Sequence, residues 1–324
     1  MSASDMVIFN QYVMPAIAEL FPQMIDKFNA ASGNTIQLTG EGFDGSYLEQ
    51  SFYNAIHGSQ RRVDRFAANG AVAATDLTQS QWNAVKVAGG FGPIRFEPSQ
   101  MTWLRKPTQE GITVAASQFA EALLADQLNT AIAALVAATE NNAAVVNDVS
   151  GAGQVTQTAI NGGLAKFGDM SQMIGALVMT GVQYHNLVGE AIANSNNLFE
   201  IGGVAVREGT AFGQGRPIVI TDAPALREAG APDKQKVLGL TAGAAQVKDG
   251  RDMITNIETN NGNQRIETTF QTDYTFGLQL KGYSWDQANG GASPSDAALA
   301  TGSNWDKVVT SDKHTAGVLI IGRE

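Results

Sequence analysis

The longest regular pattern in the chain is an alternation of residue types between Ile266 and Lys281. Apolar residues and threonines occupy every second position, namely Ile266, Thr268, Phe270, Thr272, Tyr274, Phe276, Leu278 and Leu280. A period of two over about 15 residues predicts a β-strand of about 50 Å. The run Asn260–Asn263 before it is a strong turn signal, which predicts a long hairpin. A strand of this length exceeds the needs of a compact domain and indicates an extended sheet.

A second pattern has the period of a helix and lies in residues 113–140. Alanine is frequent there, and apolar residues recur at spacings of four, four and three. The expected core face carries Leu124, Leu128, Ile132 and Leu135, whereas Asp126, Asn129 and Ala133 are expected on the far side. Such a helix makes a rod of about 39 Å, more than twice the mean length. A rod of this length typically braces a flat or elongated domain.

The first 112 residues divide into a helical part and a weakly patterned part. Apolar residues between Val13 and Phe28 predict an amphipathic helix, which Pro22 kinks and Gly33-Asn34 ends. This helix packs on its own domain or lies as an arm on a neighbouring chain, and the pattern leaves both open. Residues 34–112 favour extended strands and turns and show no long core-facing period. Because so long an unpatterned segment is unusual in a compact domain, we expect a projecting loop that a partner orders.

Residues 150–250 alternate between helical and strand-like segments, as in an α/β subdomain. The first expected helix carries Ile160, Leu164 and Phe167, and the second spans residues 182–193. Strands are expected at 176–179, 204–206, 218–220 and 237–240. Residues 286–303 are expected to form a loop, and the apolar run 317–321 a final strand.

Composition narrows the class of protein. The chain has 324 residues, 21 Lys and Arg against 31 Asp and Glu, a net charge of −10 and only 16% charged residues. Ordinary soluble domains carry about 25%, so neutral polar residues replace charged ones, which suits surfaces committed to other chains. No apolar run approaches the length of about 20 residues that a membrane span needs, and no secretory signal is evident. The absence of Cys excludes disulfides and Cys-based metal sites, and the negative charge argues against a dedicated nucleic-acid binder.

Catalytic chemistry has few candidates. The histidines His57, His185 and His314 are far apart in sequence, and none belongs to a metal-binding signature. The run Gly213–Pro217 precedes a strand, so it indicates a turn and not a dinucleotide site. Asp249, Asp252 and Glu258 lie among basic residues and indicate a solvated turn. We therefore predict no catalytic, cofactor-binding or metal-binding residue, and no enzyme activity.

One basic cluster stands out in the weakly patterned segment, Arg61, Arg62 and Arg65 with Asp64 among them. The cluster is short for a nucleic-acid site. A solvated loop and an ion pair with the acidic surface of another copy are the two other interpretations. We take these arginines as the candidate inter-subunit contact.

The order of parts resembles that of the major capsid proteins of tailed bacteriophages, which have the Hong Kong 97 type fold. Four runs carry the resemblance, which covers nearly the whole chain and points to the podophage-like branch. They are Arg61-Arg62-x-Asp64 after Phe52–Ile56 for the projecting loop, Gln118–Leu135 for the spine helix, Gly215–Asp222 for the axial-domain strand and Tyr274–Trp285 for the long peripheral-domain strand.

The resemblance implies an α+β fold with an N-terminal arm, an extended loop, a peripheral domain with a spine helix and an α/β axial domain. The arm would take residues 1–38, the extended loop 39–105, the peripheral domain 106–142 and 251–324, and the axial domain 143–250. Copies would assemble as hexamers and pentamers into an icosahedral head around double-stranded DNA, which is enclosed without sequence-specific binding. No long charged segment precedes the arm, so a separate scaffolding protein is expected.

Further partners implied are a portal and, as an open point, a decoration protein, but no membrane and no cofactor. The protein would belong to the virion and assemble in the host cytoplasm. Alternatives are an encapsulin-like compartment shell, another phage structural protein such as a tail subunit, and an α/β hydrolase with residues 143–250 as its catalytic domain. The hydrolase lacks any supporting motif in the sequence.

Overall fold

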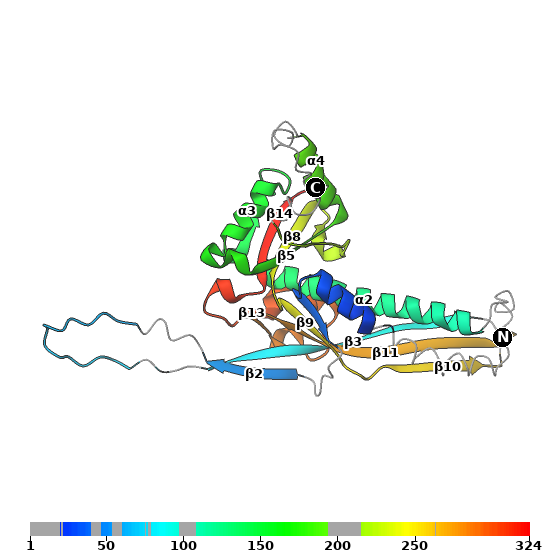
Figure 1. Cartoon of the computed structure of the whole chain (residues 1–324). Helices are drawn as coiled ribbons and strands as arrows, with labels where there is room; N and C mark the ends of the chain where they lie inside the picture. The colour runs from blue at the N-terminus through cyan, green and yellow to red at the C-terminus, as the bar shows by residue number, and fades with distance from the viewer. Residues whose placement is uncertain are drawn as a thin grey trace.

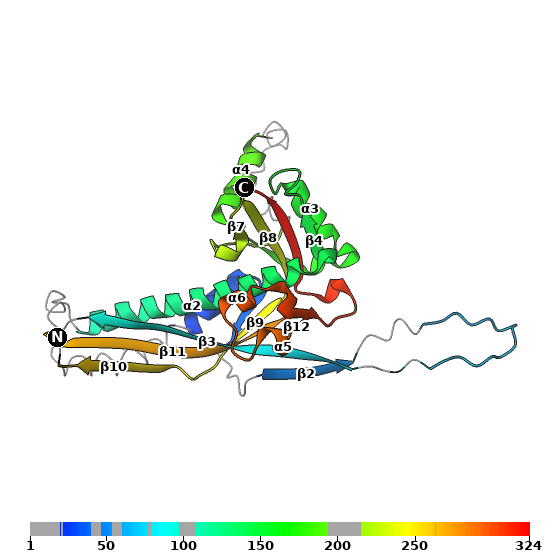
Figure 2. The same ribbon diagram turned by 180° about the vertical axis from the view of Figure 1, so that it is seen from behind.

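The computed structural model describes residues 20, 22–39, 47–53, 60–74, 76, 79–96, 108–193, 215–262 and 264–324. Within these residues the strands form one sheet of eight and a second sheet of six. The helix α2 (Thr108–Glu140) runs along the larger sheet and ends beneath the smaller one (Figure 1). The smaller sheet stands above one part of this elongated base, as the view from behind also shows (Figure 2).

The larger sheet is built around β11 (Glu267–Leu280), which confirms the predicted long strand. On one side β11 pairs with β3 (Gln79–Phe96), and on the other with β10 (Ile254–Asn260) and then β9 (Ala245–Asp249). The hairpin from β10 to β11 is also as predicted, with Gly262 at φ 109° in its turn. The remaining strands are β1 (Ile36–Thr39) on β9, β2 (Tyr47–Tyr53) on β3, β12 (Tyr283–Trp285) on β11 and β13 (Trp305–Lys307) on β12.

The first half of α2 covers one face of this sheet. The ring of Phe119 packs edge-on against Phe91 of β3 and Phe270 of β11, with centroids 5.3 and 5.2 Å apart. The hydroxyl of Tyr274 donates a hydrogen bond to Asp126 Oδ2 at 2.6 Å, and burial, together with this carboxylate, raises the pKa of Tyr274. The expectation that Asp126 lies on the far side of the helix is therefore wrong. The buried stripe runs through Ala120, Leu123 and Gln127, whereas Leu124 and Leu128 are only partly buried.

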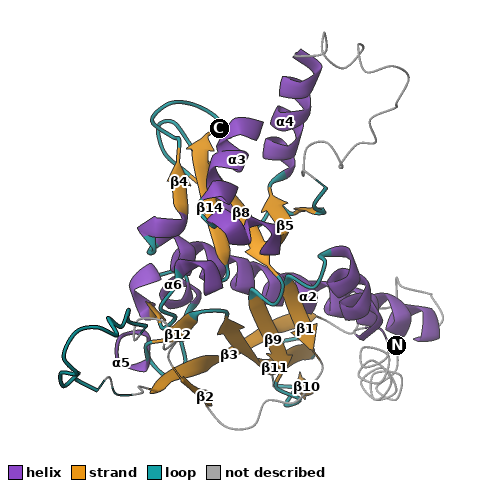
Figure 3. Ribbon diagram, turned by 60° about the vertical axis from the view of Figure 1, so that its left-hand side comes forward, coloured by secondary structure: helices purple, strands orange, loops and turns teal. Residues whose placement is uncertain are grey.

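The six-stranded sheet is buried on both faces. Along β14 (Gly317–Arg323), Val318 and Ile320 belong to the core beneath α3 (Gln157–Ala165), and Leu319 and Ile321 to the core that α2 shares. This explains why the run 317–321 is apolar without alternation. The other strands are β4 (Val146–Asp148), β8 (Lys234–Thr241), β5 (Ile174–Met179), β6 (Ile218–Ile220) and the short β7 (Arg227–Glu228), and α4 (Gly181–Ala193) is the second flanking helix (Figure 3).

The second half of α2 lies in the core on all sides. From residue 131 to residue 139, every residue except Ala133 is buried. By length and composition alone Ser117–Glu140 could cross a membrane, but 61% of its most apolar stretch is buried inside the protein. A helix buried all round is typical of a position between two packed layers.

Several expectations differ from the structure in detail. Residues 286–303 contain the short helices α5 (Gln287–Gly290) and α6 (Asp296–Leu299), which fold around the packed rings of Trp285 and Trp305. The predicted strand 204–206 lies outside the described residues. Strand β9 pairs within the larger sheet and β14 within the smaller one, so these two segments fall on the other side of the expected domain boundaries. Short 3-10 turns occur at Ala143–Val145, Gly168–Met173, Pro224–Leu226, Gly302–Asn304 and Asp312–His314.

The N-terminal helix, described over residues 22–31, packs on its own chain. Ile25 is buried in the core of the larger sheet, and the helix ends at Gly33 and Asn34, both at positive φ, as predicted. The side chain of Asn29 donates to the carbonyl of Leu38 at 2.8 Å and accepts from its N–H at 3.0 Å. Asn29 thus satisfies both backbone groups of a residue on the outer edge of β1.

Lys236 of β8 ties the end of α2 to the smaller sheet. Its side chain is 8% exposed, and its Nζ lies 2.8 Å from Glu140 Oε2 and 3.0 Å from Glu228 Oε2. Burial alone would lower the pKa of Lys236, but the two carboxylates outweigh it and raise that pKa. Hydrogen bonds from Lys236 and then Lys234 hold the pKa of Glu228 below its ordinary value.

We expect Lys236→Ala to lower the free energy of unfolding by about 2 kcal/mol near pH 7, because it removes a buried partner of two carboxylates. Lys234→Ala is the matched control: this lysine is more exposed and should cost about 0.5 kcal/mol. A carboxyl with a lowered pKa, here Glu228, stabilises the fold above its ordinary value of 4.5 and less as the pH falls through the folded value. Denaturant titrations should therefore show the Lys236→Ala deficit shrinking below about pH 4; an equal deficit at pH 3 would contradict this account.

Candidate intermolecular surface

The hairpin of β2 and β3 leads into a segment that projects from the body of the molecule (Figure 1). Every residue from 60 to 74, and also Asp76, is exposed. Phe66 is fully exposed, and Val63 and Val72 are more than half exposed. We call residues 60–74 the projecting loop. The sequence predicted a projecting segment here, and its side chains lack any core in the described part of the chain.

The three arginines predicted as a contact site all lie in this loop. Arg61, Arg62 and Arg65 form no ion pair with any described residue, and Asp64 accepts a hydrogen bond from the backbone N–H of Phe66 at 2.9 Å. The loop therefore carries three cationic side chains and one carboxylate beside an exposed aromatic ring. The three arginines and Phe66 are neighbours along this exposed loop, and in the described part of the chain no acidic side chain pairs with the arginines.

The root of the loop is held firmly by the larger sheet. The indole N–H of Trp82 donates to the carbonyl of Tyr283 at 2.7 Å, and the backbone N–H of Asn83 donates to Ser284 Oγ at 3.0 Å. Val85 and Val87 of β3 are buried against the same core. Residues 79–96 thus belong to the sheet, and the projecting part of the segment begins beyond it.

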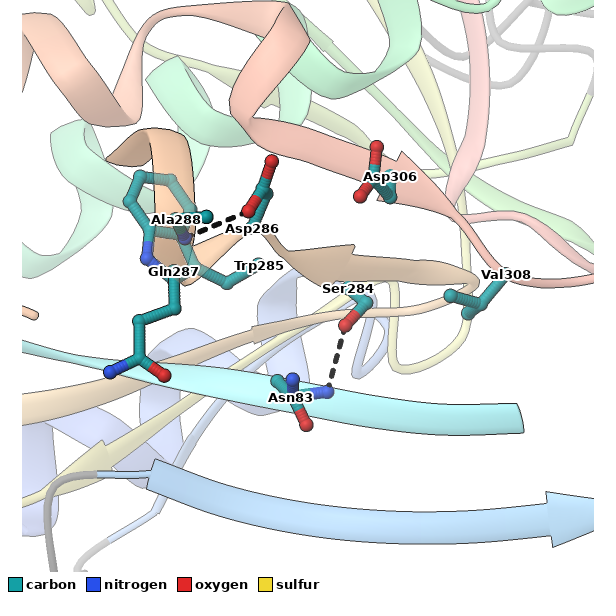
Figure 4. A pocket seen from close by; sticks show the side chains of 8 residues that line it. All are labelled: Asn83, Ser284, Trp285, Asp286, Gln287, Ala288, Asp306 and Val308. Carbon is teal, nitrogen blue, oxygen red and sulfur yellow. Dashed lines mark hydrogen bonds between the residues drawn. The ribbon is translucent and has the colours of Figure 1, made fainter. Parts of the chain in front are cut away.

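A pocket of about 690 Å³ lies beside this root, between β3, β12, β13 and α5 (Figure 4). It is lined by Asn83, Ser284, Trp285, Asp286, Gln287, Ala288, Asp306 and Val308. Asp306 lies opposite Ser284 in the ladder between β12 and β13. Asp286 begins α5, where its Oδ1 accepts from the N–H of Ala288 at 2.8 Å. We call this feature the acidic pocket.

The carboxylates of the acidic pocket have no cationic partner among the described residues. The nearest lysine in sequence, Lys307, instead lies 2.6 Å from Asp312 Oδ1. The sequence analysis missed this pocket, because Asn83 and Asp306 are far apart along the chain. A signal was present: the dipeptide Trp-Asp occurs at 285–286 and again at 305–306, and the two tryptophans pair across β12 and β13.

Of the acidic residues predicted to form a solvated turn, Asp252 lies in the turn between β9 and β10, whereas Asp249 ends β9 and Glu258 lies within β10. Arg251 has φ 54°, and Asp252 accepts hydrogen bonds from Thr275 N and Oγ1 at 3.1 and 2.5 Å. Lys86 Nζ lies 3.3 Å from Asp252 Oδ2. Burial would raise the pKa of Asp252, but the bonds from Thr275 and Lys86 outweigh it and lower that pKa. This carboxylate therefore ties the turn between β9 and β10 to β11 and is no proton donor near neutral pH.

The histidines and the turn at 215–217 are the remaining candidates from the sequence. His185 and His314 are exposed, and no group of three or more possible metal ligands occurs among the described residues. His57 lies outside them. At 215–217 the chain turns, with Gly215 at φ 82°, and Arg216 donates to the carbonyls of Ile174 and Ser171 at 2.8 and 3.1 Å. The interpretation of this run as a turn agrees with these contacts.

Comparisons with known proteins identify the family and the fold. The family model for Gp13-like proteins (major capsid protein 13-like) matches residues 5–319. A chain of the cyanophage Pam1 capsid is 12% identical with a TM-score of 0.54 and coverage of 89% of this chain and 88% of that one. A structure from Microbacterium phage Oxtober96 is 12% identical with a TM-score of 0.51 and covers 90% of each chain. The head structure of Helicobacter pylori bacteriophage KHP40 is 8% identical with a TM-score of 0.50 and covers 89% of this chain and 88% of that one. A search of curated proteins finds no match. These similarities confirm the predicted α+β fold of the Hong Kong 97 type.

We expect trypsin to cut the isolated, native chain first within the projecting loop, after Arg61, Arg62 or Arg65, because every residue around these bonds is exposed. Mass spectrometry should find an early fragment that begins at Arg62, Val63 or Phe66. The variant with all three arginines changed to Gln is the control and should lose this early cut. First cleavage within β8, after Lys234 or Lys236, would contradict the exposure described here.

Proposed function

The chain belongs to the major capsid protein 13-like family, and we propose that it builds the shell of a phage head through contacts made by its projecting loop. Membership makes it a structural protein of the virion and not an enzyme. A compartment shell and a hydrolase, the alternatives that the sequence left open, give way to this assignment.

The observation that supports the proposal is the unbroken exposure of residues 60–74. Burying a side chain such as Phe66 contributes about 2–3 kcal/mol, and arginine and aromatic residues are enriched at the centres of protein interfaces. A loop that presents both and has no core of its own gains its stabilising contacts from another chain. In a shell of identical subunits that chain is a second copy.

The same geometry supports ring-shaped assemblies. The projecting loop and the body of the subunit are different surfaces, so a contact between them in two copies is heterologous. A heterologous contact generates a closed ring when its rotation closes. We propose hexameric and pentameric rings as the units of an icosahedral shell, and keep the inter-subunit role of Arg61, Arg62 and Arg65 as part of this proposal.

Strand pairing supports a proposed division of the chain into four parts. We propose an N-terminal arm over residues 1–38 and an extended loop over 39–105, with its inner part in the larger sheet. The larger sheet with α2 would be the peripheral domain, and the six-stranded sheet with α3 and α4 the axial domain. We assign β9 to the peripheral domain because it pairs within the larger sheet, and β14 to the axial domain because it pairs within the smaller one.

Partners beyond the chain itself are inferred from charge and context. A net charge of −10 suits a container that encloses DNA without binding it tightly, because like charges repel. We propose a separate scaffolding protein and a portal as partners, with assembly in the host cytoplasm. A decoration protein remains open.

Changing Arg61, Arg62 and Arg65 together to Ala should impair assembly of rings and shells, with the circular dichroism of the subunit unchanged. Changing the three to Lys is the matched control and should retain part of the assembly, because the charge is kept although the planar guanidinium is lost. Size exclusion and negative-stain microscopy at equal concentration measure the outcome. Full assembly of the Ala variant would overturn the proposed contact, and a chain that fails to fold would place the cluster inside the domain.

A further inference from the structure

We propose that the acidic pocket of one subunit receives the tip of a second copy's projecting loop, with Arg65 on its carboxylates and Phe66 on its rim. This inference rests on the proposed function and adds the receptor to it. The loop and the acidic pocket carry matching groups, and each lacks a partner within the described part of its own chain.

Charge complementarity is the first argument. Asp286 and Asp306 line a concave surface with no cation in reach, while Arg65 projects with no carboxylate partner among the described residues. A guanidinium offers five N–H donors in a planar fork that matches carboxylate oxygens. Ser284 and Gln287 add neutral hydrogen-bonding groups to the same lining. A pocket with these acceptors fits an arginine side chain better than a neutral one.

The apolar part of the lining is the second argument. Val308 and Ala288 line the acidic pocket together with the carboxylates. Phe66 follows Arg65 directly and is fully exposed. Arginine and aromatic side chains, Phe among them, are both enriched at protein interfaces. The loop thus offers a cation and a ring side by side to a pocket that offers carboxylates beside methyl groups.

The direction of the projecting loop indicates that the two partners belong to different copies. Phe66 precedes Asn83, at the wall of the acidic pocket, by 17 residues, a stretch that carries Phe66 up to about 56 Å away when extended. Both views show the projecting loop leading away from the body beyond the ends of β2 and β3 (Figures 1 and 2). A loop held in this direction meets the acidic pocket of a neighbour and not its own.

A metal ion is the competing occupant of a pocket with two carboxylates. Calcium takes six to eight oxygen ligands. Both oxygens of Asp286 already accept hydrogen bonds, Oδ1 from the N–H of Ala288 and Oδ2 from the side-chain amide of Asn289. No group of three or more acidic or histidine ligands occurs among the described residues. The lining therefore favours an organic cation that brings its own donors.

A charge exchange in the full-length protein tests the pairing. Asp306→Arg alone and Arg65→Glu alone should each raise the concentration needed for ring formation at least about tenfold, as expected for a close interfacial ion pair. The two changes together should recover most of that loss. Glu258→Arg, with the same change of charge on the exposed strand β10, is the control and should assemble normally. No recovery in the double variant overturns the pairing, and so does normal assembly of Asp306→Arg.

A cysteine pair gives a second readout, because the chain contains no Cys of its own. Phe66→Cys combined with Asp306→Cys should give covalent ladders on non-reducing gels of assembled protein. Phe66→Cys combined with Glu258→Cys should give none. The receptor assignment is overturned if the control pair gives covalent ladders. It is also overturned if the pair at Phe66 and Asp306 gives none in assembled protein. If Asp306→Arg assembles normally while the triple Ala variant of the loop does not, this inference fails and the proposed function stands; if both assemble normally, both fail.

Discussion

The rest of the fold depends on the burial of the second half of α2 between two sheets. Ile132 and Leu135 are almost fully buried in one continuous cluster that also contains Leu319 of the smaller sheet and Leu278 of the larger. Each such side chain contributes about 2–3 kcal/mol when buried. Because one helix segment completes both cores, neither sheet can shift without opening the other. The salt bridges of Lys236 reinforce this joint at the end of the helix.

The same burial explains what the sequence analysis could and could not predict. The alternation along β11 was readable, because that strand has one face on the core and one outside. The register of α2 was not, because the buried stripe of its first half carries Ala120 and Gln127, which an apolar pattern does not mark. The pattern followed Leu124 and Leu128 instead and so misplaced Asp126. The assignment of β9 and β14 to their sheets depends on pairing with distant strands, which no local pattern encodes. The acidic pocket was likewise unpredictable, because it joins Asn83 to Asp306 through the pairing of distant strands. The projecting loop was predictable, because its segment lacks any pattern that faces a core.

The low charge of the chain has a structural meaning in this arrangement. Several of the charges that the structure describes are used within the subunit, as in the pairs of Lys86 with Asp252 and Lys307 with Asp312. The arginines of the projecting loop and the carboxylates of the acidic pocket are exceptions. Charge is thus concentrated where one copy could distinguish the right surface of its neighbour from the wrong one, which is the use of electrostatics that favours specificity over raw affinity.

The contact of Asn29 with both backbone groups of Leu38 has a consequence for association by strand addition. An open sheet edge is a template onto which any extended chain can add. The amide side chain of Asn29 imitates the peptide group of a neighbouring strand, so at this residue β1 presents a sealed edge. A protein synthesised in many copies, each with a free loop that must dock elsewhere, is exposed to such mistaken pairing. The N-terminal helix therefore closes the outer edge of β1 to strand addition at Leu38.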